Sequence, residues 1–281
     1  YDVYGIVRRH SVPEGQSSRL EHINDKITRI YGDLTDEMSI ASVVNQVKPD
    51  EIYNLGAMSH VRISFDMPAF ALTTNTMGVL YMLDYFKELC PTAKFYQASS
   101  SEMFGNSIDP DGVQRLTTPM HPVSPYGCSK VMGFNLTRHY RDAYKLHACN
   151  GILFNHESKR RGETFVTRKV TRGLANIAQG LEKCLYMGNM DAKRDWGHAK
   201  DFVKGMWLML QQSQPDDYVI ATGETHSVRE FLEVAFGCVG IDWQNHVEID
   251  PQFMRPAEVD ILRGDASKAR NQLGWSPRVS F

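Results

Sequence analysis

The sequence predicts an α/β protein built on a doubly wound parallel sheet, with a smaller second lobe towards its C-terminus. Short runs rich in Ile, Val, Tyr and Phe alternate with longer helical stretches over much of the 281 residues. This spacing is typical of right-handed βαβ units. After Phe154 the rhythm changes, and polar, basic and loop-like segments follow. The alternation predicts the sheet, and the change of rhythm predicts the second lobe.

Six apolar runs are expected to form the parallel strands. Most of them end in Gly, Ser or Asn, as buried parallel strands often do. The predicted strands are Val3–Val7, Ile27–Tyr31, Glu51–Leu55, Lys94–Ala98, Ala148–Phe154 and Tyr218–Ala221. The predicted helices between them are Asp36–Val47, Ala69–Leu89, Pro125–Lys145 and Ala199–Gln211. This order of elements predicts a Rossmann-type sheet.

The second lobe is expected to be less regular. A polar and basic segment at 155–162 precedes a helix-like stretch from Glu163 to Gln179, and residues 184–197 are predicted to form a loop. Further on we expect a helix at Val228–Cys238, a loop at Asp250–Glu258 and a short helix near Ala266–Leu273. The predicted domains are a Rossmann domain of residues 1–154 and 198–224, and a substrate lobe of residues 155–197 and 225–281.

Composition excludes several classes of protein. The formal net charge of −2 argues against a surface that coats nucleic acid. No apolar run approaches the roughly 18 residues of a membrane span, and no secretory leader is visible, so we expect a cytoplasmic protein that binds no membrane. The five cysteines are scattered and the ten histidines include no H-x-x-x-H pair. We therefore expect neither a disulfide framework nor a metal site.

The segment Ser124-Pro125-Tyr126-Gly127-Cys128-Ser129-Lys130 carries the strongest chemical signal. Ser124 suits a helix N-cap and Pro125 a first helical position. Tyr126 and Lys130 are four residues apart and therefore share a helix face. A nearby ammonium favours the phenolate, so we expect Lys130 to lower the pKa of Tyr126 and make it a usable base. Surface residues at this spacing are the plainer alternative.

A second candidate site follows the strand at Lys94–Ala98. The run Gln97 to Gly105 places Ser99, Ser100, Ser101 and Glu102 at the carboxyl end of the sheet, where open α/β sheets bind ligands. A serine hydroxyl here could hydrogen-bond a substrate alcohol, and Glu102 could move a second proton. An ordinary serine-rich turn with a solvated glutamate explains this segment alone equally well.

Three further strand ends suggest a dinucleotide. In Asn54–His60, Gly56 and Ala57 allow close backbone approach. In Gly32–Asp36, Asp33 could accept from an adenine amine or cap the next helix. Arg8 and Arg9 end the first predicted strand, and arginine at this place suits a 2′-phosphate, which predicts NADP over NAD. A solvated basic turn is the alternative for these arginines.

The glycine-rich phosphate loop of a Rossmann domain is absent from these residues. If Val3–Val7 is the second strand of the sheet, we expect the first strand, the loop and its helix to be missing, which is roughly 25–30 residues. We also expect one or two helices to be missing at the C-terminal end.

Arginines gather in three polar segments of the second lobe. They are Asn155–Glu163, Lys193–Trp196 and Arg255–Glu258. Because arginine pairs well with phosphate oxygens, convergence of these segments would suit a diphosphate on the substrate. Taken from spacing alone, surface salt bridging is the simpler explanation.

Together these segments resemble the extended short-chain dehydrogenase/reductase family, and within it the GDP-mannose 4,6-dehydratases. The matching phrases extend almost end to end: GIVRR, GDLTD, EIYNLGAMSHVRISFD, FYQASSSEMFG, SPYGCSK, GILFNHESKRRGETFVTRKV, GNMDAKRDWGHAKD, DDYVIATGETHSVREF, RPAEVD and LGWSPRV.

The resemblance implies an oxidation, elimination and reduction on one nucleotide sugar. Tyr126 would take the C4 hydroxyl proton while the C4 hydride passes to NADP⁺. Glu102 would remove the C5 hydrogen as water leaves from C6, and the hydride would return to C6, giving GDP-4-dehydro-6-deoxy-D-mannose. Lys130 would tune Tyr126 and hold the nicotinamide ribose, and Ser100 would hydrogen-bond the C4 oxygen.

The resemblance also implies binding residues and an assembly. NADP would contact Arg8, Arg9, Asp33, Leu34, Leu55, Gly56, Ala57, Ser59, Tyr126, Lys130, His156 and Arg161. GDP-mannose would contact Asn155, Lys169, Arg194, Arg255 and Glu258. A homodimer or homotetramer is expected, with Arg8–Ser11 where tetrameric members make subunit contacts.

Three positions depart from the family pattern. Ser100 replaces a threonine and loses the methyl that restricts its rotamer. Met58 replaces the usual glutamine, which removes one polar cofactor contact, and Phe70 replaces a common tyrosine hydroxyl.

Other functions are compatible with parts of the pattern. A GDP-manno-heptose 4,6-dehydratase or a GDP-4-keto-6-deoxymannose reductase would use much the same site. A catalytically silent Rossmann protein that binds a nucleotide and regulates a partner is the alternative outside enzymes. The presence of Ser100, Glu102, Tyr126 and Lys130 together argues against it, because a binding protein needs none of their chemistry.

Overall fold

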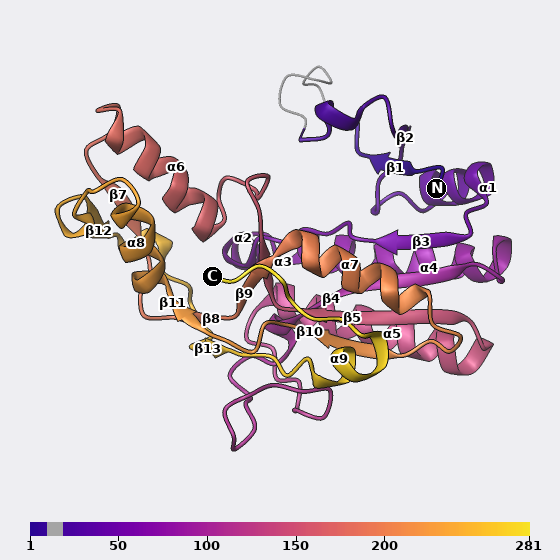
Figure 1. The fold of residues 1–281 in the computed structure, drawn as a ribbon. Helices are drawn as coiled ribbons and strands as arrows, with labels where there is room; N and C mark the ends of the chain where they lie inside the picture. The colour runs from indigo at the N-terminus through magenta and orange to yellow at the C-terminus, as the bar shows by residue number, and fades with distance from the viewer. Residues whose placement is uncertain (10–18) are drawn as a thin grey trace.

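A computed structural model describes residues 1–9 and 19–281, and its largest sheet confirms the predicted Rossmann-type fold (Figure 1). Four parallel strands follow the order β10-β5-β4-β3. They are β3 (Glu51–Asn54), β4 (Lys94–Ser100), β5 (His147–Leu153) and β10 (Asp217–Ile220). All four lie within two residues of the predicted strand starts and ends, because buried parallel strands are continuous apolar runs.

The two N-terminal strands form a separate pair. β1 (Tyr4–Val7) and β2 (Thr28–Tyr31) are parallel to each other. Within the described residues no ladder joins β1 to β3, so the sheet is in two pieces. The expectation of a further strand and glycine loop ahead of Tyr1 stays a prediction.

Helices cover both faces of the four-stranded sheet (Figure 1). On one face α5 packs directly against β4 and β5, and α4 packs against α1 and α5; on the other face lie α7 and α9. Their bounds are α1 (Glu37–Val47), α4 (Gly78–Leu89), α5 (Pro125–Tyr144), α7 (Ala199–Leu210) and α9 (Ser267–Leu273). The N-cap prediction for α5 is confirmed, because the Ser124 hydroxyl accepts from the Gly127 N–H at 3.0 Å.

The predicted single helix at Ala69–Leu89 is wrong in its middle. α3 (Pro68–Leu72) passes into a π-helical turn, η2 (Thr73–Met77), before α4 begins. The buried Asn75 amide on this turn accepts from the Met58 N–H at 2.8 Å and donates to the Met58 carbonyl at 3.0 Å. Such a tertiary contact leaves no trace in hydrophobic periodicity. The short helix α2 (Val61–Asp66) was also not predicted.

The second lobe lies to one side of the sheet (Figure 1). Its helices α6 (Val166–Ala178) and α8 (Val228–Gly237) confirm the helical predictions there, although α6 begins three residues later than expected. Short 3-10 turns complete the described chain: η1 (Glu21–Ile23), η3 (Ser101–Met103), η4 (Trp243–Asn245) and η5 (Pro251–Phe253).

The loop predicted at 184–197 is wrong, because three short strands lie there. They pair with distant segments: β7 with β12, β9 with β6, and β8 with both β11 and β13. Strands of two or three residues are too short for an alternation to be recognised in the sequence. Their bounds are β6 (Asn155–Glu157), β7 (Leu185–Met187), β8 (Lys193–Arg194), β9 (Trp196–His198), β11 (His226–Ser227), β12 (Val247–Ile249) and β13 (Ile261–Leu262).

The described residues form several apolar cores, one of which lies between α1 and α4. One core lies around β4, β5 and β10, and the chain from Val259 to Trp275 adds apolar side chains to it. Another core joins α6, α8 and β7. Among residues 1–9 and 19–281, no helix is both long and apolar enough to cross a bilayer.

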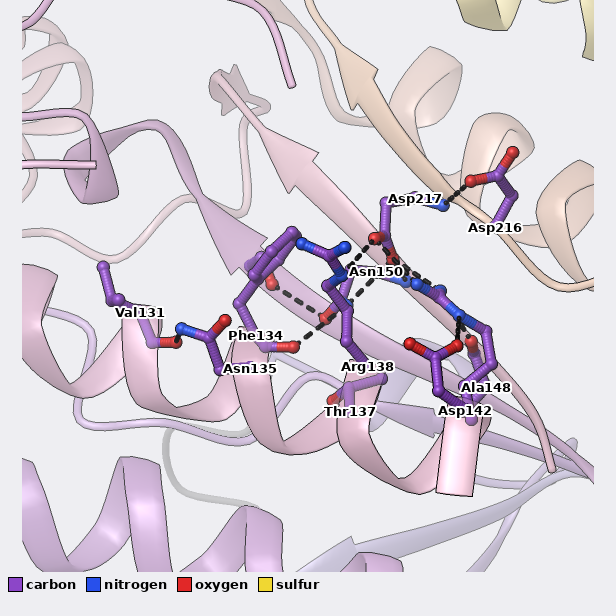
Figure 2. A network of polar contacts seen from close by, with 12 residues as sticks. Val131, Phe134, Asn135, Thr137, Arg138, Asp142, Ala148, Asn150, Asp216 and Asp217 are labelled. Carbon is purple, nitrogen blue, oxygen red and sulfur yellow. Dashed lines mark hydrogen bonds and ion pairs between the residues drawn. The ribbon is translucent and has the colours of Figure 1, made fainter. Parts of the chain in front are cut away.

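A polar ladder crosses the middle of the four-stranded sheet. Asn54, Gln97, Asn150 and Asp217 are paired in register from β3 to β10, and all four are buried. Figure 2 shows Asn150 and Asp217 in contact between α5 and the sheet. Arg141 of α5 binds both Asp217 carboxylate oxygens, at 2.7 and 2.9 Å. This pair ties the helix that carries Tyr126 to the sheet beneath it.

We expect Asp217→Asn to lower the free energy of unfolding by about 3 kcal/mol, because the largely buried Arg141 side chain loses its nearest counter-ion. Urea unfolding measures the effect. Asp216→Asn is the matched control, because Asp216 is more exposed and pairs with Lys268 at the surface, where ion pairs contribute less than about 1 kcal/mol. Equal losses in the two variants would contradict a special role for the buried pair.

Candidate active site

A cavity of about 910 Å³ lies where the carboxyl ends of the sheet strands face the second lobe. Both sides contribute to its wall, so residues far apart in sequence converge there. The predicted site residues that line it are Leu55, Ala57, Ser59, Ser100, Glu102, Tyr126, Lys130, Asn155, His156, Arg161, Lys169, Arg194, Arg255 and Glu258.

Five predicted cofactor residues do not line this cavity: Arg8, Arg9, Asp33, Leu34 and Gly56. Arg9 stacks over the Tyr31 ring at 4.1 Å, and Asp33 accepts from the Thr35 N–H at 2.9 Å. That hydrogen bond is the main cause of the lowered pKa of Asp33, and Asp36, rather than Asp33, caps α1. His10 and Ser11 lie outside the described residues.

Tyr126 and Lys130 both point from α5 into the cavity wall, and both are buried. The Lys130 ammonium donates to the Ala98 carbonyl at 2.9 Å and lies 5.7 Å from the centre of the Tyr126 ring. Burial raises the pKa of Tyr126 to about 12 and lowers the pKa of Lys130 to about 8. The expectation of a lowered Tyr126 pKa is therefore wrong for the protein alone, because desolvation outweighs the lowering by the Ser100 hydrogen bond and by Arg161.

Ser100 connects the tyrosine to the glutamate. Its hydroxyl accepts from the Glu102 N–H at 3.2 Å and caps η3, and its hydrogen bond to Tyr126 works against the raised pKa of that phenol. Glu102 is 8% exposed, and its Oε2 is buried with no hydrogen-bond partner in the described part of the chain. A buried carboxylate oxygen with a free lone pair at a cavity wall can accept a proton from a bound molecule.

Two arginines and a glutamate meet opposite Glu102. Arg194 donates to Glu258 Oε1 at 2.9 Å, and Arg255 Nη1 lies 3.2 Å from the same oxygen. Arg255 Nη1 also lies 3.5 Å from Glu102 Oε1. Burial lowers the pKa of Arg194, which is 6% exposed. The convergence predicted for the Arg194 and Arg255 segments is confirmed, and the surface alternative does not hold for them.

His156 and Lys169 are two more predicted residues that line the cavity. His156 stacks on Phe202, and its Nδ1–H donates to the Phe154 carbonyl at 2.9 Å. Burial lowers the pKa of His156, so the neutral imidazole is favoured. At another point the Lys169 ammonium lies 3.4 Å above the centre of the Phe253 ring.

Sequence reasoning missed several residues of the cavity wall. His60 lines it, caps α2 through Nδ1, and packs its ring 5.5 Å from that of Phe165. Apolar side chains of α7 and the second lobe complete the wall, and no pattern in the sequence marks them. Those not predicted include His60, Phe165, Val203, Met206 and Phe253.

The arrangement combines two proton-transfer groups with an anion-binding pair in one cavity. A phenol and a carboxylate linked by one serine suit successive proton transfers on neighbouring atoms of a substrate. The guanidinium groups of the buried Arg194 and the partly buried Arg255 suit phosphate oxygens. This fold, with a Tyr–Lys pair on the helix behind the sheet, defines a protein of the extended short-chain dehydrogenase/reductase class.

The chain belongs to the GDP-mannose 4,6-dehydratase family. The model of that family, described as GDP-mannose 4,6 dehydratase, matches residues 1–281. GDP-mannose 4,6 dehydratase 1 of Arabidopsis thaliana is 50% identical over 293 residues, which cover 100% of this chain and 80% of the relative. The human GDP-mannose 4,6 dehydratase is 47% identical over 308 residues, covering 100% and 82%.

Solved structures share the fold at lower identity. The dTDP-glucose 4,6-dehydratase of Streptomyces venezuelae, solved with NAD, superposes with a TM-score of 0.85 at 24% identity, covering 98% of this chain and 83% of that one. The UDP-glucose 4-epimerase of Thermotoga maritima, solved with UDP-glucose, gives 0.84 at 23% identity, covering 100% and 87%. These two likenesses show the fold alone.

Proposed function

We propose that the protein is a GDP-mannose 4,6-dehydratase that converts GDP-mannose to GDP-4-dehydro-6-deoxy-D-mannose. The observation that carries the proposal is the buried, unpartnered Glu102 oxygen beside Tyr126, in a cavity that also holds Arg194 and Arg255. Family membership and relatives near 50% identity support the same substrate and reaction.

The chain's own groups supply the proton transfers. Tyr126 Oη would accept the proton of the C4 hydroxyl, and the Ser100 hydroxyl would hold the C4 oxygen. The ketone at C4 acidifies the C5 hydrogen, which Glu102 Oε2 would accept as a proton and pass to the C6 hydroxyl, so that this group leaves as water. When the hydride returns to C6, a proton from solvent would be added at C5. Arg194 and Arg255 would bind the diphosphate and so fix the sugar against these groups.

A nicotinamide dinucleotide fits one side of the cavity. Leu55, Ala57, Ser59, His156 and Arg161 line the cavity together with Tyr126 and Lys130. A bound oxidised nicotinamide would supply reversible hydride-transfer chemistry and a positive charge that favours the Tyr126 phenolate. The adenosine half would contact Arg8, Arg9, Asp33, Leu34 and Gly56, outside the cavity.

We propose that the two parts of the chain on either side of the cavity bind different molecules. Residues 1–154 and 198–224 would bind the dinucleotide, and residues 155–197 and 225–281 would hold the nucleotide sugar. Asn155 and Lys169 line the cavity on the second side, with the arginines.

For the cofactor we propose NADP, because Arg8 and Arg9 follow β1 at the sheet edge that faces the adenosine ribose in Rossmann folds. Arg8→Ala is expected to raise the KM for NADP about tenfold and to change the KM for NAD less than about twofold. Arg270→Ala, at an exposed position on α9, is the control. An equal loss for both cofactors would contradict a 2′-phosphate contact.

The function is tested by incubating the protein with GDP-mannose and NADP⁺ and identifying the product by mass spectrometry and NMR. A dehydratase forms the 4-keto-6-deoxy sugar with no net change in NADPH. A reductase would instead consume NADPH in proportion to a keto-sugar substrate. Absence of any product with GDP-mannose would overturn the proposal.

A further inference from the structure

Asn106 joins the turn that follows Glu102 to the second lobe through two side-chain hydrogen bonds. Its Nδ2 donates to the Glu258 carbonyl at 3.0 Å, and its Oδ1 accepts from the Asp260 N–H at 2.9 Å. The amide thus binds a backbone segment more than 150 residues away in the sequence. Asn106 lies only four residues after Glu102.

The geometry of the turn aims this side chain. Gly105 has a φ of +57°, and a Cβ there would collide with the His121 carbonyl oxygen. Gly105 also forms an isolated bridge with His121. A residue with a side chain could not adopt this backbone without moving the turn, so the direction of Asn106 is built into the fold.

The segment that Asn106 binds is the support for both arginines. The Asp260 carbonyl accepts from the Lys193 N–H at 2.8 Å and lies 3.5 Å from Arg194 Nη1. The Glu258 carboxylate binds Arg194 and Arg255. Any shift of residues 258–260 relative to η3 therefore moves both guanidinium groups relative to Glu102.

We propose that Asn106 is a positioning residue that fixes where the Arg194–Arg255 pair lies relative to Glu102. The inference rests on the proposed function, because the relative position of these groups affects the rate only if a diphosphate bound to the arginines places a sugar carbon at Glu102. Asn106 itself contacts no reacting atom. Misplacement by about 1 Å can lower a rate by up to about 100-fold, so a small loss of register is measurable.

A further contact, made by Gln114, also joins this loop to the C-terminal part of the chain. Gln114, further along the same loop, accepts from the Arg263 N–H, and its own N–H donates to the Arg263 carbonyl at 2.8 Å. Asn106 is exposed, whereas Gln114 is fully buried. A substitution at Asn106 should therefore shift residues 258–260 relative to η3 and leave the second lobe folded.

The test compares the Kd for GDP with the kcat for GDP-mannose in Asn106→Ala. We expect kcat to fall about tenfold, while the Kd for GDP, measured by calorimetry, changes less than about twofold. Asn106→Asp should give an intermediate kcat, because its oxygen still accepts from Asp260 while the donor to Glu258 is lost. Thermal melting of each variant verifies folding.

Asn135→Ala is the matched control, because the exposed Asn135 amide donates to the Val131 carbonyl within its own helix. A kcat within twofold of wild type in Asn106→Ala would overturn the inference. A parallel loss of GDP affinity would overturn it too, because the lobe would then be disturbed as a whole. If wild type makes no product from GDP-mannose, the proposed function itself fails and the inference fails with it.

Discussion

Replacing Glu102 by glutamine is expected to abolish formation of the 6-deoxy product while GDP-mannose still binds. The amide has nearly the same shape as the carboxylate, but it cannot accept the C5 proton. Because Glu102 Oε2 has no hydrogen-bond partner among residues 1–9 and 19–281, the substitution breaks no hydrogen bond at that oxygen. Loss of a positioned general base lowers rates by about 10² to 10⁴-fold.

Product formation followed by NMR in deuterated water measures both parts of this prediction. Wild type should place deuterium at C5, and Glu102→Gln should not, although calorimetry should show sugar-nucleotide binding within about threefold of wild type. Glu88→Gln, at an exposed position on α4, is the control. Unchanged turnover in Glu102→Gln would remove this carboxylate from the mechanism.

Tyr126→Phe is expected to lower kcat by a similar factor, about 10² to 10⁴-fold. The substitution removes only the hydroxyl that accepts the C4 proton, so the buried ring and the helix remain in place. The pKa of this phenol is about 12 in the protein alone, so its phenolate is scarce at neutral pH and activity should rise with pH. That rise should disappear in the variant.

The pH dependence of kcat/KM between about pH 6 and 9 tests this assignment. The upper part of that range also reaches the pKa of about 8 of Lys130, whose loss of charge would oppose the rise. Tyr144→Phe is the control, because it removes the hydroxyl of an exposed tyrosine on the same helix. A small effect of Tyr126→Phe on kcat would mean that another group accepts the proton.

The fold was predictable where local pattern and tertiary structure agree. The parallel strands and the capped helix at Ser124 are readable because burial on both faces and the N-cap are local features. The π-turn at Asn75 and the two-residue strand β8 were missed, because each exists through a contact with residues far away in sequence. No local periodicity encodes such contacts.

The site was predictable in its chemistry and less so in its electrostatics. The residue types at Ser100, Glu102, Tyr126 and Lys130 indicate proton transfer from the sequence alone, and the structure places them around one cavity. The direction of the Tyr126 pKa depends on burial, which spacing does not give. The bridge by Asn106 depends on a turn held by Gly105, so no motif announces it.

The ion pairs of Arg194 and Arg255 with Glu258 and Glu102 affect which anions can bind in the cavity. Two cations and two carboxylates cancel, so an arriving ion meets a neutral cluster instead of an open positive one. A chloride or a single phosphate must compete with carboxylates that are already in contact, and gains little by doing so. A diphosphate attached to a nucleoside and a sugar brings further contacts along the cavity. We therefore expect chloride and inorganic phosphate to bind this cluster more weakly than a nucleoside diphosphate sugar does.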